Sequence, residues 1–208
     1  MIINLIYNKM KRLFFVVAIM MASTCVFAQH APGSLTVQPR IGFSGADFSN
    51  TSDTKARVGL IVGPEFEYTV SNRFSLAFGF NYSQQGAELD SKYYHTATNV
   101  TYKMDYLTVP IVANVYLLKG LALKAGIQPG YNLSAKMDAD GTKVDFKDDA
   151  IKKFDFSIPF GLSYEFYNIV LDARYTIGLT KIFDEKIVDL DSKNIGFQLT
   201  LGYKFTLF

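Results

Sequence analysis

Tryptophan is absent from this chain of 208 residues, and cysteine occurs only once, as Cys25. Because Cys25 lies in an N-terminal segment that we expect to be removed, the mature chain should contain no thiol. That excludes disulfide bonds, thiolate catalysis and cysteine-ligated zinc. The sequence also lacks any internal run of about 18 apolar residues, which excludes a helical inner-membrane protein.

The N-terminus has the pattern of a secretory signal peptide. Basic residues within 9–12 precede a short apolar run over 13–21, and small residues stand at positions −3 and −1 of a cleavage site after Ala28. We therefore expect residues 1–28 to be removed and residues 29–208 to form a single domain. Of the 21 basic residues, 18 then remain against 19 acidic ones, so no basic surplus indicates nucleic acid as a partner.

From position 34 to the C-terminus, apolar and polar residues alternate with a period of two. Leu171 and Tyr175 would face one side of a strand, and Asp172 and Arg174 the other. This combination is typical of a membrane-spanning β-barrel, because a soluble lipocalin-like barrel buries its apolar face instead. Eight such segments predict eight strands: Leu35 to Ser44, Arg57 to Val70, Phe74 to Gln84, Tyr102 to Leu117, Leu121 to Lys136, Phe154 to Phe166, Ile169 to Thr180 and Asn194 to Leu207.

The connections between these segments are alternately short and long. Turn formers make up the short ones, and the long polar ones cover 45–56, 85–101, 137–153 and 181–193. Barrels of the Gram-negative outer membrane have short periplasmic turns and long extracellular loops. The sequence therefore predicts an all-β fold, an eight-stranded antiparallel up-and-down transmembrane β-barrel. It should be a multi-pass protein of the outer membrane with both termini in the periplasm.

The polar face of the strands carries charges of both signs. Each Arg or Lys near the middle of the bilayer would cost about 2–4 kcal/mol if it faced lipid, so this face should line the lumen. We interpret the set as a structural salt-bridge plug, and a pathway for protons or small solutes is the alternative. The predicted lumen charges are Arg40, Arg57, Glu65, Glu67, Lys124, Asp155, Glu165, Asp172, Arg174 and Lys204.

Four prolines fall inside the predicted strands: Pro64, Pro110, Pro129 and Pro159. Each removes one N–H donor from a ladder that has no free edge. We therefore expect a bulge or a local kink at each of them.

Two loop segments contain residue types that occur in catalytic or metal sites. His95 with Asp90 and Ser91 has the composition of a hydrolytic triad, but no nucleophile-elbow motif accompanies it. Several aspartates follow Lys136, which occupies the first position of a would-be calcium loop, where a carboxylate is required. Asp140-Gly141 instead predicts a two-residue hairpin turn. We expect neither a catalytic residue nor a metal or cofactor site.

Three stretches carry a resemblance to a known family. They are Tyr-Leu-Thr-Val-Pro-Ile at 106–111, Gly-Pro-Glu-Phe at 63–66 and the ending Asn-Ile-Gly-Phe-Gln-Leu-Thr-Leu-Gly-Tyr-Lys-Phe at 194–205. With them, the chain resembles the PorT-type outer-membrane β-barrel domain family over essentially its whole mature length. The resemblance implies an eight-stranded barrel inserted by the barrel assembly machinery. One type of member assists protein secretion and maturation.

The sequence therefore predicts a monomeric, non-enzymatic barrel with a filled lumen. It would act structurally or by recognition through its extracellular loops, and an accessory role in protein secretion is the narrower version. Outer-membrane lipid and other envelope or secretion proteins are the expected partners. Candidate recognition residues in the 85–101 loop are Tyr93, Tyr94 and His95. The alternatives are a small-solute channel and a loop-based hydrolase or acyltransferase.

Overall fold

The computed structural model describes residues 31–49, 54–89, 100–139, 142–145, 152–181 and 193–208. None of the described residues forms a helix that is long and apolar enough to cross a membrane. The expected signal peptide and the loop residues Tyr93, Tyr94 and His95 lie outside the described residues. The strands are β1 (Leu35–Phe48), β2 (Thr54–Ser71), β3 (Phe74–Gly79), β4 (Asn81–Leu89), β5 (Val100–Thr108), β6 (Ile111–Leu118), β7 (Leu121–Ala139), β8 (Thr142–Asp145), β9 (Phe154–Phe166), β10 (Ile169–Lys181), β11 (Lys193–Tyr203) and β12 (Phe205–Thr206).

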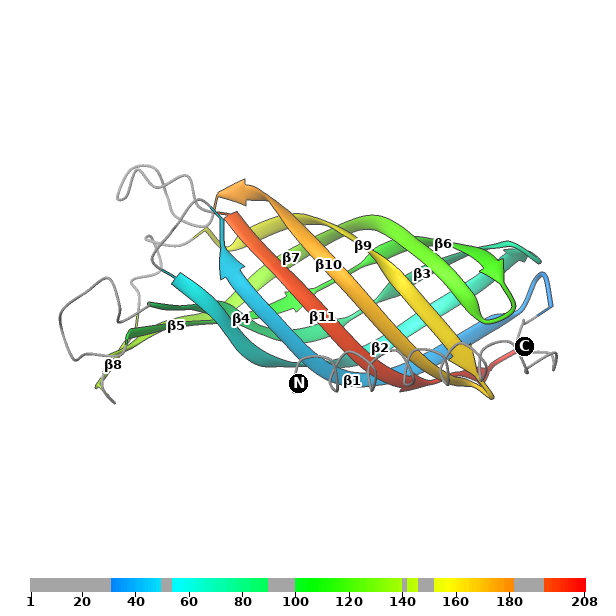
Figure 1. Cartoon of the computed structure of the whole chain (residues 1–208), viewed down its shortest axis with the longest axis horizontal. Helices are drawn as coiled ribbons and strands as arrows, with labels where there is room; N and C mark the ends of the chain where they lie inside the picture. Colours follow the sequence, from blue (N-terminus) through cyan, green and yellow to red (C-terminus); the bar gives the residue numbers. More distant parts are fainter. Residues whose placement is uncertain (1–30, 50–53, 90–99, 140–141, 146–151, 182–192) are drawn as a thin grey trace, which may run out of the picture.

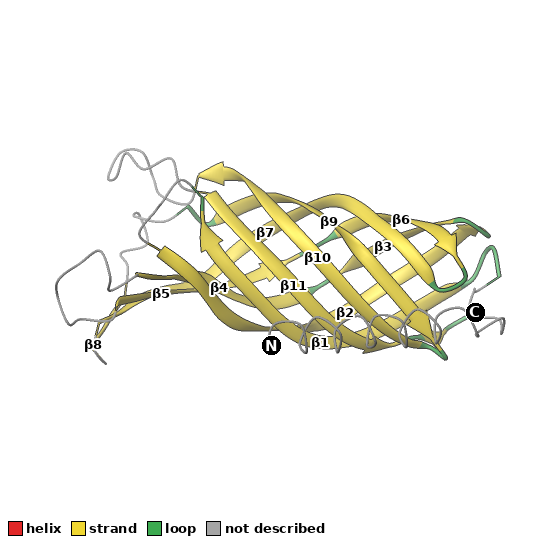
Figure 2. Ribbon diagram, in the orientation of Figure 1, coloured by secondary structure: helices red, strands yellow, loops and turns green. Residues whose placement is uncertain are grey.

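These segments form one closed antiparallel sheet. β1 pairs with β2 on one side and with β11 and β12 on the other, which closes the ring. β3 pairs with β6 and β4 pairs with β5, and the two pairings share one continuous register. β3 and β4 are therefore a single interrupted strand of the barrel, and so are β5 and β6. The same holds for β11 and β12. Eight strands therefore make up the barrel (Figures 1 and 2). This confirms the predicted eight-stranded fold.

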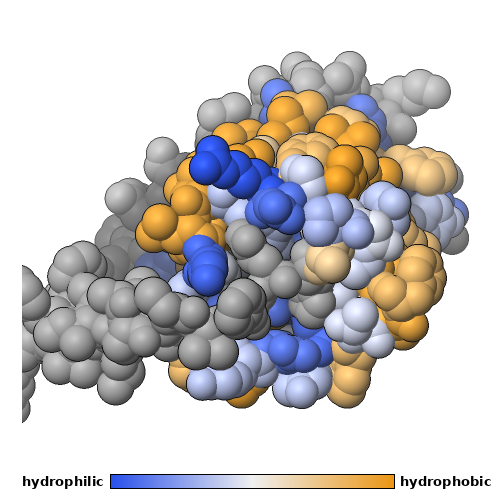
Figure 3. Space-filling model, turned by 90° about the vertical axis from the view of Figure 1, so that its right-hand side faces the viewer, coloured by the Kyte–Doolittle hydropathy of each residue, from blue (hydrophilic) through white to orange (hydrophobic). Residues whose placement is uncertain are grey.

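The two ends of the barrel differ in their connections (Figure 1). At one end the strands are joined by the turns at 72–73, 119–120 and 167–168, and we call it the short-turn end. Tyr167 and Asn168 both have positive φ, 47° and 67°, as a two-residue hairpin turn requires. The other end, which we call the long-loop end, carries the long connections. Seen from the short-turn end, hydrophilic residues lie centrally and hydrophobic ones around them (Figure 3).

The prolines interrupt the hydrogen-bond ladder without shifting it, so the prediction of a bulge is wrong at these positions, while that of a local kink stays a prediction. Phe80, between β3 and β4, donates its N–H to the Pro64 carbonyl at 3.0 Å, and Val109, before β6, donates to Pro129 at 2.8 Å. A proline has no N–H to return, so each strand loses one bond opposite it. The register is the same on both sides of each interruption, and Pro159 pairs in step with β10.

The register shifts lie elsewhere, toward both ends of the barrel. Near the long loops they occur between Ala56 and Ile61 in β2, between Asp105 and Tyr106 in β5, and after Ile177 in β10. Near the short turns they occur between Thr69 and Ser71 in β2 and between Tyr116 and Leu118 in β6. An extra residue in one strand increases the local twist and bends the strand. None of these shifts falls at Pro64, Pro110, Pro129 or Pro159.

The outer wall consists of large apolar side chains, and Leu201, for example, is 54% exposed. Neighbouring strands place Tyr82, Leu107, Tyr131 and Phe154 side by side near the long-loop end. At the short-turn end the rings of Tyr203 and Phe205 are 4.8 Å apart. Aromatic side chains in these two positions match the girdles that flank the hydrocarbon band of membrane barrels.

Beyond the girdle near the long-loop end, charged side chains appear on the outer face of the wall. β2, β4, β5, β7 and β8 continue past it as a strand extension (Figure 1). Its outer face carries Glu88 and Lys103, and Lys103 forms an ion pair of 2.6 Å with Asp138. Its inner face contains the fully buried Ala87 and Met104 together with the buried Gln85. Charged groups on the outer face indicate that water, not hydrocarbon, surrounds this part of the sheet.

Replacing a lipid-facing side chain by arginine tests which face meets the membrane. We expect Leu171→Arg to lower the free energy of folding into bilayers by about 2–4 kcal/mol, because the guanidinium would enter hydrocarbon. Thr176→Gln should cost less, since Thr176 faces the lumen next to Gly196 and an uncharged polar side chain adds no unpaired charge there. Urea titrations of both variants in lipid vesicles measure the difference, and equal losses would contradict the assigned faces.

Candidate functional site

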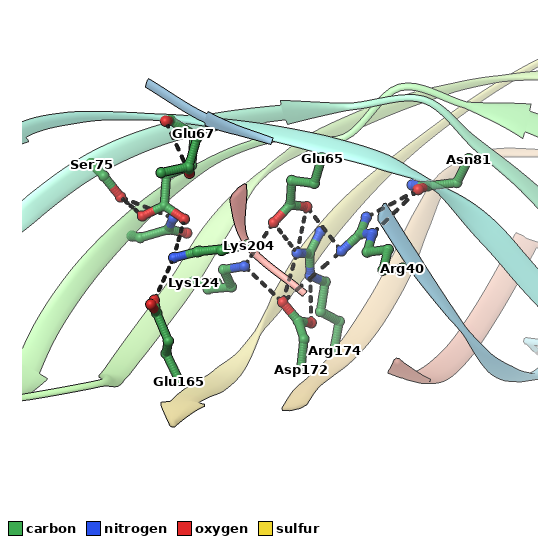
Figure 4. Close-up of polar contacts among 12 residues, drawn as sticks. Arg40, Glu65, Glu67, Ser75, Asn81, Lys124, Glu165, Asp172, Arg174 and Lys204 are labelled. Atoms are coloured by element: carbon green, nitrogen blue, oxygen red, sulfur yellow. Dashed lines mark hydrogen bonds and ion pairs between the residues drawn. The ribbon is translucent and has the colours of Figure 1, made fainter. Parts of the chain in front are cut away.

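The interior of the barrel contains a cluster of charged side chains from strands on different sides of the ring. Arg40 comes from β1, Glu65 from β2, Lys124 from β7, and Asp172 and Arg174 from β10. All five are almost completely buried, Arg174 to 1% exposure. They occupy polar positions of the alternation, which turn them away from lipid. We call these five residues the central cluster (Figure 4).

Glu65 connects the cations of the central cluster. Its carboxylate accepts a hydrogen bond from Arg174 Nη2 at 2.6 Å and another from Lys124 Nζ at 2.8 Å, and it lies 2.9 Å from Arg40 Nη1. Asp172 accepts from Lys124 Nζ and from Arg174 Nη2, both at 2.7 Å. The cluster therefore joins β1, β2, β7 and β10 across the lumen by charge-assisted hydrogen bonds.

A second cluster lies beside the first, around Lys204 (Figure 4). Lys204 Nζ is 2.7 Å from Glu165 Oε2 and 2.8 Å from Glu67 Oε2. Glu67 also accepts hydrogen bonds from Ser75 and Tyr116. We call these five residues the terminal cluster, since Lys204 lies close to the C-terminus.

The two clusters balance each other electrically. The central cluster has three cations and two carboxylates, whereas the terminal cluster has one cation and two carboxylates. A buried charge without a partner costs several kcal/mol, and removing one member of a buried pair typically costs about 3–5 kcal/mol. A neutral, mutually paired set is therefore the arrangement that a narrow, poorly hydrated lumen can hold.

The lumen toward the long-loop end has a different character. Ile61, Met104 and Tyr106 are buried inside the barrel, and Asn194 donates to the Tyr106 hydroxyl at 3.3 Å. Asp155, which the alternation also assigned to the lumen, belongs to neither cluster. It accepts a hydrogen bond from the Thr180 hydroxyl at 2.7 Å.

Several uncharged partners of the clusters were not singled out from the sequence. Asn81 accepts from Arg40 at 3.2 Å, Ser75 donates to Glu67 at 2.5 Å, and Asn114 donates to Ser75 at 3.0 Å. Their positions in the alternation place these side chains on the inward face, so the sequence could have identified them as lumen residues. Which charge each of them meets depends on strand register, which the alternation does not give. The described residues contain no group of three or more His, Cys, Asp or Glu side chains that could hold a metal ion.

Replacing Glu65 tests how much the buried ion pairs of the central cluster stabilise the barrel. Because Glu65→Ala leaves three buried cations with one carboxylate, we expect it to reduce the free energy of unfolding by about 3–5 kcal/mol. As the matched control, Lys103→Ala breaks an ion pair with 39% and 17% exposed side chains and should cost at most about 1 kcal/mol. Equilibrium unfolding in urea compares the two, and a small loss for Glu65→Ala would contradict a structural role of the pairing.

Several solved structures of bacterial outer-membrane proteins are similar to this fold. The crystal structure of Ail, the attachment invasion locus protein of Yersinia pestis, in complex with the heparin analogue sucrose octasulfate is 18% identical to this chain. The match covers 83% of this chain and 99% of the Ail chain, with a TM-score of 0.50. Neisserial surface protein A is 16% identical, with coverages of 85% and 98% and a TM-score of 0.47. At these identities the likeness concerns the fold alone.

The sequence itself matches a family model over most of its length. No curated protein matches the chain. The model described as "Outer membrane protein beta-barrel domain" matches residues 27–184, which include strands β1 to β10 and both buried clusters except Lys204. The chain therefore belongs to the outer membrane protein beta-barrel domain family.

Proposed function

We propose that this protein is a monomeric, non-enzymatic outer-membrane barrel that acts by recognition at its long-loop end. Short turns and both termini would face the periplasm, and the strand extension would face the cell exterior. The alternation of short and long connections supports this orientation, because outer-membrane barrels have long loops on the outside. Since the ring is closed, no strand edge within the membrane requires a second copy.

The strand extension is the observation that carries the proposal. Sheet pairing continues beyond the girdle, from Gln84↔Asp105 up to Glu88↔Thr101, and the outer face is charged there. This part lies outside the hydrocarbon, and the ladder holds it in place, so it can present the adjoining loops on a rigid base. Binding residues are often found on loops that a rigid scaffold positions.

The buried clusters support a non-enzymatic role for the lumen. Each carboxylate of the two clusters is bound to at least one cation at 2.9 Å or less. Groups held in this way stabilise the barrel and are not free to take a proton from a substrate. Conduction of ions would require these pairs to separate, so we assign the lumen a structural role.

Within the family, we propose a PorT-type protein with an accessory role in protein secretion. The Tyr-Leu-Thr-Val-Pro-Ile stretch at 106–111 supports this assignment, and it spans the interruption between β5 and β6. The barrel would be inserted by the barrel assembly machinery. Other envelope or secretion proteins would be its partners, through residues of the 85–101 loop such as Tyr93, Tyr94 and His95.

Shortening the strand extension tests recognition directly. Replacing residues 88–101 by Asn-Gly joins Ala87 to Tyr102, which are paired, through a two-residue turn. The variant should still migrate anomalously in SDS until it is heated, because the barrel ladder is intact. We expect it to fail to restore the amount of secreted protein in cells that lack the wild-type protein.

Single substitutions serve as controls for this experiment. Lys103→Ala keeps the loop and should restore secretion. His95→Ala should restore it in part, because His95 is one of several proposed contact residues, whereas loss of a catalytic base would abolish it. Full restoration by the shortened protein would contradict recognition through this loop. Complete failure of His95→Ala, with full restoration by Tyr93→Ala and Tyr94→Ala, would favour the loop-based enzyme.

Single introduced cysteines test the orientation, because the mature chain is expected to have none. We expect Glu88→Cys, on the exposed face of the extension, to react in intact cells with a maleimide that cannot cross membranes. Asn72→Cys, in a short turn, should react only after the outer membrane is permeabilised. The opposite pattern would place the short turns outside.

A further inference from the structure

One carboxylate in the lumen has no cation as a partner. Asp155 of β9 points inward near the long-loop end, next to the girdle residue Phe154. It accepts hydrogen bonds from the Thr180 hydroxyl, at 2.7 Å, and from the Asn194 amide, but it forms no ion pair with any described lysine or arginine. Every carboxylate of the two buried clusters has a cation within 2.9 Å. Among the inward carboxylates that the structure describes, Asp155 is therefore the exception to charge pairing.

Asn194 of β11, beside this carboxylate, has an acceptor oxygen without a donor. Its side chain is only 5% exposed, and its Nδ2 donates to the Tyr106 hydroxyl at 3.3 Å. A carboxylate only accepts hydrogen bonds, so the end of the amide that faces Asp155 is also Nδ2. Asn194 Oδ1 is then left without a partner in a buried position. Because an unpaired buried acceptor is unfavourable, this oxygen calls for a positively charged or donating group next to it.

A second unpaired acceptor lies close by on the same inward face. Gln128 of β7 donates through Nε2 to the Ser157 hydroxyl at 3.4 Å, and its buried Oε1 has no partner. Gln128 lies opposite Ser157, and Gly130 lies opposite Asp155, so these two pairs are neighbours along β7 and β9. The side chains around Asp155 therefore offer carbonyl oxygens that the protein itself does not use.

The glycine at position 130 leaves room beside these oxygens. A methyl group at Gly130 would lie 3.5 Å from Thr108 Cγ2 and 3.7 Å from both Asp155 Cβ and Tyr106 Cδ1, which are ordinary contacts. A methyl group at Gly126, on the same face of β7, would instead collide with a backbone carbonyl of β6. Close packing of the strands thus requires glycine at 126 but not at 130. The hollow over Gly130 can hold a group of at least the size of a methyl, and a dehydrated alkali-metal ion is smaller.

We propose that Asp155, Asn194 and Gly130 frame a binding site for a monovalent metal cation, Na⁺ or K⁺. The donors available there are oxygens of a carboxylate, of amides and of hydroxyls, and oxygen ligands suit hard cations. With a single carboxylate, a monovalent ion leaves the site neutral, whereas Ca²⁺ or Mg²⁺ would leave an unpaired charge in the lumen. Asp155 is only half-buried, so the ion can enter from the long-loop end.

The ion would connect several strands at the level of the girdle. Asp155 belongs to β9, Gly130 to β7 and Asn194 to β11, and Thr180 of β10 lies between β9 and β11. The cation would neutralise a carboxylate there, as lysine and arginine side chains do in the two clusters. This role depends neither on the function proposed above nor on which side of the membrane the loops face.

Unfolding in different salts tests for the ion. The full barrel in lipid vesicles is unfolded with urea in the chlorides of Na⁺, K⁺ or N-methylglucamine, which is too large for the hollow, at one pH and one ionic strength. A ligand that binds only the folded protein stabilises it with the logarithm of its concentration. Above the dissociation constant, we expect a tenfold increase in Na⁺ or K⁺, exchanged for N-methylglucamine, to raise the ratio of folded to unfolded protein about tenfold.

Three variants separate the site from general effects of salt. Asp155→Asn keeps the shape of the side chain but removes its charge, and Gly130→Ala fills the hollow with ordinary contacts. Both should abolish the dependence on Na⁺ or K⁺. Glu88→Gln removes an exposed carboxylate on the outer face and should retain the dependence in full. Gly130→Ala leaves every charge in place, so it still tests the site if Asp155→Asn does not become heat-modifiable.

A crystal grown with Tl⁺, which replaces K⁺ and scatters X-rays strongly, gives a direct readout. We expect an anomalous peak beside the Asp155 carboxylate. A water molecule there in place of Tl⁺ would overturn the proposal, as would equal stability in the three salts. Dependence on the cation that persists in both Asp155→Asn and Gly130→Ala would overturn it too. Stabilisation by methylammonium but not by Na⁺ or K⁺ would assign the site to an amine and contradict a metal ion.

Discussion

Hydrocarbon offers no partner to a backbone N–H or C=O group, and this constraint governs the whole structure. It requires a closed ladder, and eight strands close into a ring that is narrow enough for side chains to fill. The interior then has to accept the polar half of every strand. Buried charges are stable in such a space only when they pair, and the contacts of Glu65 and Lys204 meet that requirement.

The pairing has a consequence for folding. Glu65 and Arg174 are 109 positions apart in the sequence, yet they are joined by two hydrogen bonds in the lumen. Such a contact forms only after β2 and β10 belong to the same ring. The central cluster thus stabilises the closed barrel over any open sheet, because an open sheet would leave these charges without the partners that closure provides.

Much of this arrangement could be predicted from the alternation of residues. It gave the eight strands and the side of each strand that carries charge, because a period of two translates directly into two faces. It could not predict that the charges divide into two clusters, with Asp155 apart, since that depends on register and barrel shear. The expected bulges at Pro64 and Pro129 were wrong for a related reason. A proline weakens the ladder opposite itself, and the strand can keep its register when the neighbouring residue still donates.

The strand extension makes the mouth of the barrel asymmetric. β7 continues to Ala139, whereas its neighbour β9 begins at Phe154, level with the girdle residue Tyr131. Among the described residues, the strands of the extension thus reach further from the membrane than β9 does (Figure 1). Paired backbone carries the chain out of the membrane on that flank, so a loop joined to it starts from a fixed point well above the girdle.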